Sequence, residues 1–465
     1  MAAQALGGAG RFGLEQSEAG TRLNLQSRVN GGELLVGGLY ARLPAHPVQW
    51  DLGAEFRRGA IMLDRLRIDD PDALQLDGSL ALDARGTLQR LRLDRVHASF
   101  PAAYDRYGRA WLAAQGVREL HTTGHLSGSL YWRSGDVQAF AFATDGLDET
   151  EPDGRFAVEG LRGALDWSAQ GERPASTLAW QDLRFHRLAL GPAQTRWQSF
   201  TGTLELQQPF AAPLFKGQLH VASLDWRPNA AKAQRLATSF AISGVDMASF
   251  SHALGWPAFP GTLAGAVPSL RWVGDRFELA GGLSINVFGG FVDVTGLSLQ
   301  QPFGVAPVLT GDIRLSQLDL AAITSVFDFG NITGRLDGRI DDLRLVNWSP
   351  VMFKASLLAG GGGRISQRAV NNLTSVGGGG IAGGLQGAML KLFKTFGYKR
   401  IGLSCTLKGD ICSMGGLGPA KDGYAIVEGS GLPRLNVIGH QREVDWATLV
   451  RRLKAATEGD GPVVR

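Results

Sequence analysis

Apolar and polar residues alternate along most of this 465-residue chain. The alternation is clearest in residues 74–83, 218–222 and 277–287, where leucine, isoleucine, valine or phenylalanine occupies most of the alternate positions. A period of two is typical of half-buried antiparallel strands, because successive side chains point to opposite faces of a sheet. The pattern therefore predicts a mainly β protein whose strands each carry one apolar face.

A β-hairpin is predicted at Gly289-Gly290. A two-residue turn there pairs Val287 with Val292 and Ile285 with Val294. Cross-strand partners share a face, so these four side chains collect on one side of the sheet.

An internal repeat accompanies the strands. The segments Asp246–Ala248 and Gly261–Gly265 return as Asp319–Ala321 and Gly334–Gly338, at a constant offset of 73 residues and without gaps. A looser third copy of the Gly-x-Leu-x-Gly core begins at Gly124. Self-similarity at a fixed period is typical of stacked supersecondary units.

Each copy of the repeat also predicts a short helix. Asp246 and Asp319 are natural N-caps, since a carboxylate can accept from the first free backbone amides of a helix. The predicted helices are Met247–Leu254 and Leu320–Phe327. The glycines that follow predict bulges, strong curvature or close approach of neighbouring backbones.

These patterns predict an elongated, curved antiparallel β-sheet in the form of a groove, built from stacked repeats with a few short helices. Residues 1–239 are predicted to be a groove region with weak repeats, and residues 240–359 to hold the two 73-residue units. Residues 360–465 are predicted to form a C-terminal α+β module that shields the end of the array. Amphipathic helices are predicted there over Ile381–Phe396 and Val444–Leu453.

Composition narrows the class of protein. The net charge of +4 is small for this length, and no long basic run is interleaved with aromatic residues, which argues against a nucleic-acid binder. No run of 18 uncharged apolar residues is present, and the start lacks the apolar core of a signal peptide. We expect the chain to be the C-terminal part of a longer protein or a sequence with a misplaced start. A cytosolic protein with a frayed N-terminus is the alternative.

The two cysteines, Cys405 and Cys412, lie close together in the sequence. A turn at Lys408-Gly409, within a four-residue loop, would place them opposite one another as a non-hydrogen-bonded pair. That geometry suits a disulfide, whereas metal binding needs more ligands than two. Two free thiols are the alternative. A disulfide favours an oxidising compartment such as a periplasm.

No pattern in the sequence predicts an enzyme, a cofactor site or a metal site. The Gly-x-Gly-x-x-Gly match at residues 8–13 follows no apolar strand. His121 and His125 are interpreted as exposed strand residues. The acidic pairs Asp69-Asp70 and Asp341-Asp342 are interpreted as solvated carboxylates at turns.

An apolar face along curved sheet would suit acyl chains, because each buried methylene contributes roughly 0.8 kcal/mol. A closed hydrophobic core is the alternative for the same residues. The candidate lining residues are Leu76, Leu80, Leu82, Leu219, Val221, Leu279, Leu283, Ile285, Val287, Val292 and Val294.

The segment Leu318–Leu345 resembles the repeat of AsmA-like bacterial envelope proteins, the bridge-like lipid transfer group that includes TamB, YhdP and YdbH. The segment Ala369–Gly380 resembles the C-terminal region of YdbH-type members. The resemblance covers about residues 240–455. It implies a periplasmic β-groove, anchored in the inner membrane by an N-terminal helix that this chain lacks, which conducts phospholipids toward the outer membrane of a Gram-negative envelope. The family has no catalytic residues to carry over.

The function expected from this reasoning is lipid binding and intermembrane lipid transport, with phospholipid acyl chains as the ligand. An outer-membrane lipoprotein or a barrel-assembly protein is a candidate partner of the C-terminal module. The alternative is a non-enzymatic scaffold for outer-membrane protein assembly, which would offer strand edges or that module to its partner.

Overall fold

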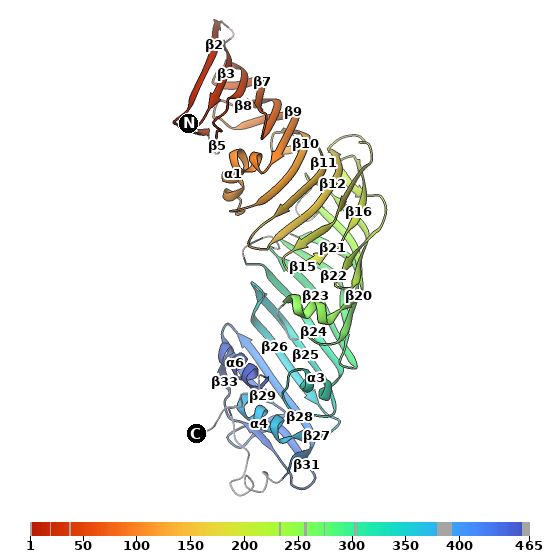
Figure 1. Cartoon of the computed structure of the whole chain (residues 1–465). Helices are drawn as coiled ribbons and strands as arrows, with labels where there is room; N and C mark the ends of the chain where they lie inside the picture. Colours follow the sequence, from red (N-terminus) through yellow and green to blue (C-terminus); the bar gives the residue numbers. More distant parts are fainter. Residues whose placement is uncertain are drawn as a thin grey trace. The chain divides into compact units, whose positions relative to one another are not determined.

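The computed structural model describes residues 2–18, 20–36, 39–231, 234–254, 258–273, 275–301, 304, 306–378 and 393–457. Most of these residues lie in antiparallel strands that pair with their neighbours in sequence, and the helices are short, which confirms the mainly β prediction (Figure 1). The chain divides into two compact units, and the division falls within β19 and β20. Unit 1 comprises residues 1–214 and 220–238, and unit 2 comprises residues 215–219 and 239–465.

Unit 1 is a curved sheet of long strands followed by shorter ones, with a small separate sheet of β1, β4 and β5. A π-helical turn, η1, and helix α1 connect β9 to β10. The elements are β1 (Ala2–Gln4), β2 (Gly7–Ser17), β3 (Gly20–Asn30), β4 (Glu33–Val36), β5 (Leu39–Arg42), β6 (Val48–Arg57), β7 (Ala60–Asp70), β8 (Leu74–Leu82), β9 (Leu88–Phe100), η1 (Tyr104–Gly108), α1 (Arg109–Ala114), β10 (His121–Arg133), β11 (Asp136–Thr150), β12 (Phe156–Ser168), β13 (Ser176–Trp180), β14 (Asp182–Phe185), β15 (Leu188–Leu190), β16 (Ala193–Phe200), β17 (Thr203–Leu206), β18 (Phe210–Leu214) and β19 (Gly217–Trp226).

Unit 2 continues with long antiparallel strands and ends in a module where helices pack on the sheet. Its elements are β20 (Leu236–Asp246), α2 (Met247–Leu254), β21 (Gly261–Val273), β22 (Arg276–Val287), β23 (Gly290–Gln300), β24 (Val308–Asp319), α3 (Leu320–Val326), β25 (Arg335–Val346), β26 (Ser349–Ala359), β27 (Gly363–Ser366), α4 (Gln367–Val376), β28 (Thr395–Lys408), β29 (Ile411–Gly416), β30 (Gly418–Ala420), β31 (Gly423–Ser430), β32 (Val437–Gly439), β33 (Glu443–Asp445) and α6 (Trp446–Thr457). Across the described ranges, no helix is long and apolar enough to cross a membrane.

The 73-residue sequence repeat is also a structural repeat. The order β20, α2, β21, β22 returns as β24, α3, β25, β26, with element ends at corresponding positions. Asp319 caps α3, since its Oδ1 accepts from the amide of Ala321 at 2.8 Å, and Asp246 Oδ2 accepts from the amide of Ser249 at 2.9 Å. Helix α2 has the predicted bounds, while α3 ends at Val326, one residue early. The predicted boundary at residue 239 lies beside the division between the units, whereas residues 360–465 belong to the same unit as the two repeats.

The second glycine of each Gly-x-Leu-x-Gly core lies where the neighbouring strand approaches closely. A Cβ at Gly338 would meet the carbonyl oxygen of Ser356 at 2.9 Å, and one at Gly128 would overlap the carbonyl oxygen of Ala141. Contacts closer than about 3 Å do not occur between a real Cβ and a backbone oxygen without movement of one strand. Of the roles predicted for these glycines, the structure shows close backbone approach at Gly128 and Gly338. It also shows irregular, bulge-like strand pairing beside Gly124 and Gly128.

The predicted hairpin between β22 and β23 exists, but its register was wrong by two residues. Its turn is Phe288-Gly289, one position earlier than predicted, with positive φ at both residues. Val287 consequently pairs with Gly290, and Ile285 with Val292. Positive φ at two central residues matches the twist of the flanking strands. Since a shift of two residues preserves the alternation, the predicted faces remain correct.

The C-terminal module encloses the largest hydrophobic core of the described residues, where Ile365, Leu407 and Ile426 are completely buried. Helix α4 packs on this core and was not predicted; Ser366 caps it by accepting from the amide of Ala369. Of the helix predicted over Ile381–Phe396, residues 381–392 lie outside the described residues. Its predicted end was wrong, because Phe396 belongs to β28, where it pairs with Ile365 and is buried. Helix α6 begins at Trp446, two residues after the predicted start.

A disulfide joins Cys405 and Cys412, whose Cα atoms are 5.6 Å apart. The predicted geometry of the hairpin was wrong, because the strands continue to Lys408 and Ile411 and the turn is only two residues long. In this register Cys405 is opposite Met414. The disulfide therefore links diagonal neighbours rather than directly opposed residues.

Candidate functional site, an apolar sheet face

Unit 2 carries an apolar face that its strand register aligns from one strand to the next. Ile285 of β22 pairs with Leu263 of β21 and with Val292 of β23, and Val292 pairs in turn with Leu315 of β24. Paired residues in a sheet point to the same side, so the row is continuous. We call this surface the unit 2 apolar face; it comprises Leu263, Leu270, Leu279, Leu283, Ile285, Val292, Val294, Leu309, Ile313, Leu315, Ile340 and Leu357.

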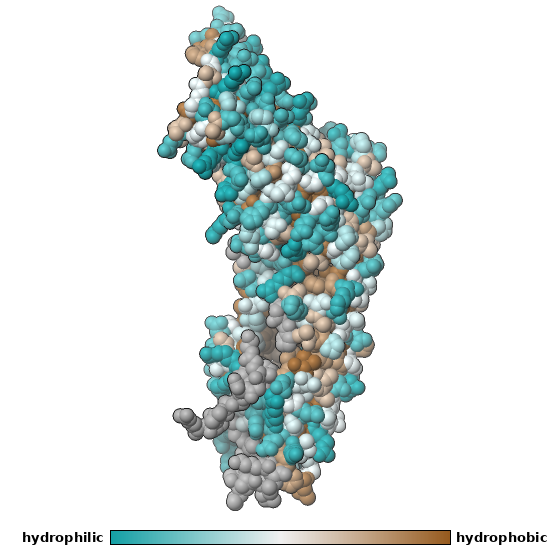
Figure 2. Space-filling model, in the orientation of Figure 1, coloured by the Kyte–Doolittle hydropathy of each residue, from teal (hydrophilic) through white to brown (hydrophobic). Residues whose placement is uncertain are grey.

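Much of this face is only half-buried. Ile285, Val292 and Ile313 keep part of their surface exposed, whereas Leu407 and Ile426 in the C-terminal module have none. Hydrophobic residues also gather on the surface of unit 2 in the space-filling view, near the strand labelled β23 in Figure 1 (Figure 2). A closed core would bury such residues fully, so the half-burial indicates a face that remains accessible.

The opposite side of the same strands is polar. Asn286, Arg314 and Arg339 alternate with the apolar positions and are exposed. Ser284 donates to Asp293 Oδ1 at 2.7 Å across the β22–β23 pair. The two sides of the sheet therefore differ as the alternation predicted, with one side suited to water and the other to apolar material.

Unit 1 has a corresponding row, the unit 1 apolar face. Leu76 of β8 pairs with Ile68 of β7 and with Val96 of β9. The row reaches the first long strand, where Phe12 is 77% exposed. The face comprises Phe12, Leu14, Leu23, Leu25, Leu52, Leu63, Leu66, Ile68, Leu76, Leu80, Leu82, Leu91, Leu93, Val96, Leu130, Phe140 and Phe142.

The later strands of unit 1 close part of this face into a core. Leu165, Trp167 and Leu204 are buried together, with Phe140 packed against them. The ring centroids of Phe140 and Trp167 lie 5.6 Å apart. The burial of apolar side chains thus increases along the sheet of unit 1: they are half-exposed in β7–β9 and become buried at β12.

The predicted lining residues fall into two groups in the structure. Those in β8 lie on the unit 1 apolar face, and those at 279, 283, 285, 292 and 294 lie on the unit 2 apolar face. All of these are half-buried. Val287 and Val221 are buried, at 4% and 7% exposure, and Leu219 is half-buried in β19. Val287 and Val221 are therefore poorly placed to touch a ligand.

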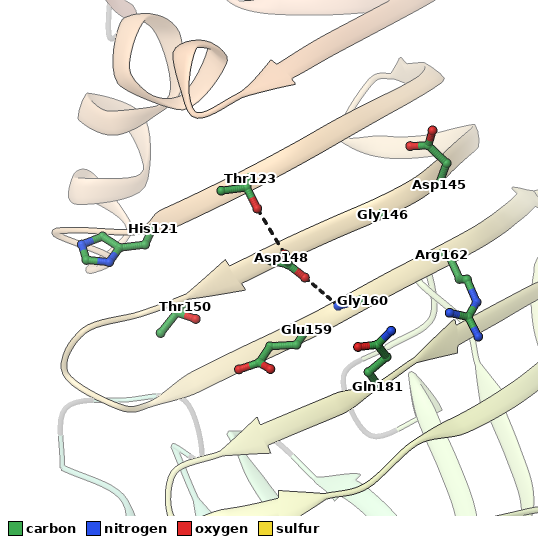
Figure 3. A pocket seen from close by; sticks show the side chains of 10 residues that line it. All are labelled: His121, Thr123, Asp145, Gly146, Asp148, Thr150, Glu159, Gly160, Arg162 and Gln181. Atoms are coloured by element: carbon green, nitrogen blue, oxygen red, sulfur yellow. Dashed lines mark hydrogen bonds between the residues drawn. The ribbon is translucent and has the colours of Figure 1, made fainter.

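A polar depression of about 600 Å³ is lined mainly by residues of β10, β11 and β12 (Figure 3). Its central carboxylate, Asp148, accepts from Thr123 Oγ1 at 3.2 Å and from the amide of Gly160 at 2.6 Å. Glu159, also in the lining, is paired with Arg184 at 2.8 Å. These carboxylates hold the irregular strands in register. Among the described residues, no group of three or more histidine, cysteine or acidic side chains could hold a metal ion.

Asp70 contradicts its predicted role as a solvated turn residue, because it is completely buried. Arg106 Nη1 donates to both carboxylate oxygens, at 2.7 and 2.8 Å, and Tyr107 Oη donates to Oδ2 at 2.8 Å. His46 Nε2 lies 3.0 Å from Oδ1. Burial alone would raise the pKa of Asp70, but the hydrogen bonds from Arg106, His46 and Tyr107 outweigh it and lower this pKa below its ordinary value.

The cluster around Asp70 fastens η1 to the end of β7, at one edge of the unit 1 apolar face. Sequence reasoning missed it because the partners of Asp70 lie 24 to 37 residues away along the chain. No local signal in the sequence connects them. His121 and His125 are exposed on β10, as predicted.

No protein-family model, curated protein or solved structure matches this chain. The geometry of the two apolar faces is therefore the basis for assigning a function.

Proposed function

We propose that this chain is a non-enzymatic lipid-binding protein of a Gram-negative envelope, whose apolar sheet faces conduct phospholipid acyl chains between membranes. The observation that carries the proposal is a row of half-buried aliphatic side chains that stays in register over successive strands, as in Ile285, Val292 and Leu315. A soluble protein rarely leaves such a row accessible unless something apolar occupies it.

The dimensions of the sheet suit an acyl chain. Neighbouring strands lie about 4.8 Å apart, so four strands offer about 19 Å of apolar surface along the row. Each methylene removed from water contributes roughly 0.8 kcal/mol, which holds a chain of many methylenes on the face. Successive positions on the row are chemically alike, so movement from one set of strands to the next exchanges equivalent contacts. A headgroup would stay in water at the edge of the sheet.

The periplasmic location belongs to the same proposal. The Cys405–Cys412 disulfide suits an oxidising compartment. The resemblance of Leu318–Leu345 to the AsmA-like repeat favours the same compartment and the same ligand class.

Site-specific photocrosslinking in cells tests the proposal. A photoreactive amino acid at Ile285 should capture phospholipid, whereas the same group at Asn286 should not, because these neighbours point to opposite sides of β22. The two positions are neighbours in the same strand, so they lie at nearly the same distance from the turn. Equal capture at both positions, or capture at neither, would show that the face does not bind lipid.

One observation favours the scaffold as a second candidate. Among the described residues, β2 pairs only with β3, so its 11-residue length presents a second, open edge. A partner strand could add there and extend the unit 1 apolar face beyond Phe12 and Leu14. Purified protein that retains an envelope protein through this edge, and that carries no lipid, would favour the scaffold over the lipid conductor.

A further inference from the structure

The loop between β31 and β32 contains a leucine whose side chain is almost fully exposed to solvent. Leu432 is 99% exposed, which is the largest exposure among the large hydrophobic side chains of the described residues. It follows Gly431, whose φ of +76° turns the chain outward at the end of β31. The end of β31 lies at one extremity of unit 2 (Figure 1). An isolated exposed leucine is common on protein surfaces, so its surroundings decide its meaning.

Basic side chains gather around Glu428, which lies four residues before Leu432. Arg400 pairs with Glu428 across β28 and β31, and three cationic groups face that single carboxylate: Arg400 at 2.7 Å, Lys399 at 3.9 Å and Arg434 at 4.0 Å. The three side chains are 49%, 69% and 63% exposed. A hydrogen bond from Arg400 lowers the pKa of Glu428, so this carboxylate stays ionised. Since three cationic side chains face this one carboxylate, the cluster has a net positive charge.

The strand register brings a second apolar side chain to the same end of the sheet. Gly397 pairs with Ser430, so the segment just before β28 lies beside the segment just after β31. Phe393, in that segment, is 40% exposed, and Lys394 next to it is exposed as well. The end of unit 2 thus combines two exposed apolar side chains with an excess of basic ones.

We propose that this tip, Leu432 together with Lys399, Arg400 and Arg434 at the same end of the sheet, is a contact site for an anionic phospholipid bilayer surface. A leucine at a loop tip can enter the boundary between headgroups and acyl chains, while lysine and arginine remain among anionic headgroups. A protein partner is disfavoured because the apolar part is a projecting tip rather than a flat patch ringed by polar groups. The site is independent of the apolar faces, since it needs a bilayer surface and no lipid on the sheet.

The test uses the full chain and vesicles of phosphatidylcholine with or without phosphatidylglycerol, whose anionic headgroup attracts lysine and arginine by about 1 kcal/mol per side chain. An environment-sensitive fluorophore on Leu432→Cys should shift its emission to the blue with the anionic vesicles. The matched control is the same fluorophore on Ile411→Cys, another exposed aliphatic residue of unit 2, beside the turn at the far end of β28. That control should not respond.

Binding variants complete the experiment. Leu432→Asp and Arg434→Glu should each weaken vesicle cosedimentation by about tenfold, since one loses the inserted side chain and the other reverses a charge. Ile411→Asp should bind as the unaltered chain does. A rise to 0.5 M salt should weaken binding, because exposed charges are screened.

Three results would overturn the assignment: no emission shift at position 432, an equal shift at position 411, or unchanged binding by Leu432→Asp. A failure of the photocrosslinking at Ile285 would leave this outcome untouched. The two proposals can therefore fail separately.

Discussion

Truncation of an apolar side chain separates an open sheet face from a closed core. Ile285 is half-buried between Leu263 and Val292, whereas Leu407 of the C-terminal module has no exposed surface. Ile285→Ala removes three carbons, worth about 2.4 kcal/mol if all were fully buried. Because the face is half-open, water fills the space and the expected cost is about 1 kcal/mol. Leu407→Ala adds a closed cavity and should cost about 3–4 kcal/mol.

The measurement is urea unfolding of the two variants and the unaltered chain, followed by circular dichroism. The midpoint of the transition that reports unit 2 should move about three times as far for Leu407→Ala as for Ile285→Ala. Equal shifts for the two variants would show that Ile285 lies in a closed core. In that case lipid could not reach the unit 2 apolar face without unfolding it.

Three further predictions concern what holds the sheets together. Asp70→Ala should destabilise unit 1 by about 3–5 kcal/mol, because it leaves a partly buried guanidinium without its partner. Since the pKa of Asp70 is lowered on folding, its contribution is complete above its unfolded pKa of about 3.9 and is lost as the pH falls through its folded pKa. Gly128→Ala should lower the thermal midpoint of unit 1, while Gly13→Ala, whose Cβ meets no atom within 4 Å, should not. Reduction of the Cys405–Cys412 disulfide should cost unit 2 roughly 2.5 kcal/mol, the value for a loop of this length.

Each of these has a clear contrary outcome. If the Asp70→Ala variant unfolds in acid at the same pH as the unaltered chain, Asp70 does not contribute to the acid sensitivity of unit 1. Equal midpoints for the two alanine variants would mean that close backbone approach does not explain the repeated glycine. An unchanged unfolding curve after reduction, with thiol titration confirming two free thiols, would contradict a stabilising disulfide.

The alternation of residue types predicted which face each side chain takes, and it did so even where the pairing was wrong. The β22–β23 hairpin shows why: its turn is one residue early, its register moves by two, and Ile285 still faces Val292. The side of the sheet to which a residue points depends only on whether its position along the strand is odd or even, whereas the pairing register depends on the geometry of the turn. The Asp caps of α2 and α3 were predictable for a similar reason, since each acts within three residues of itself.

Features that depend on distant parts of the chain were not predictable. The burial of Asp70 follows from Arg106 and Tyr107, which only the folded η1 brings to it. Phe396 matches a helical stripe in sequence, but pairing with Ile365 places it in a strand. The exposure of Leu432 likewise depends on how the turn after β31 leaves the sheet. Local pattern carries no information on any of these three.

The repeat unit of the second half of the chain contains an even number of strands. β20, β21, β22 and β23 precede β24, which occupies the position of β20 in the next copy. Every strand reverses direction, so four of them restore it, and α2 and α3 both connect strands at the same rim of the sheet. The other rim has short connections, such as Asn347-Trp348 between β25 and β26. Duplication of a whole unit therefore lengthens the apolar row and keeps each rim and each face of the sheet in place. The length of the sheet can thus change by duplication of repeats while the contacts within each repeat stay the same.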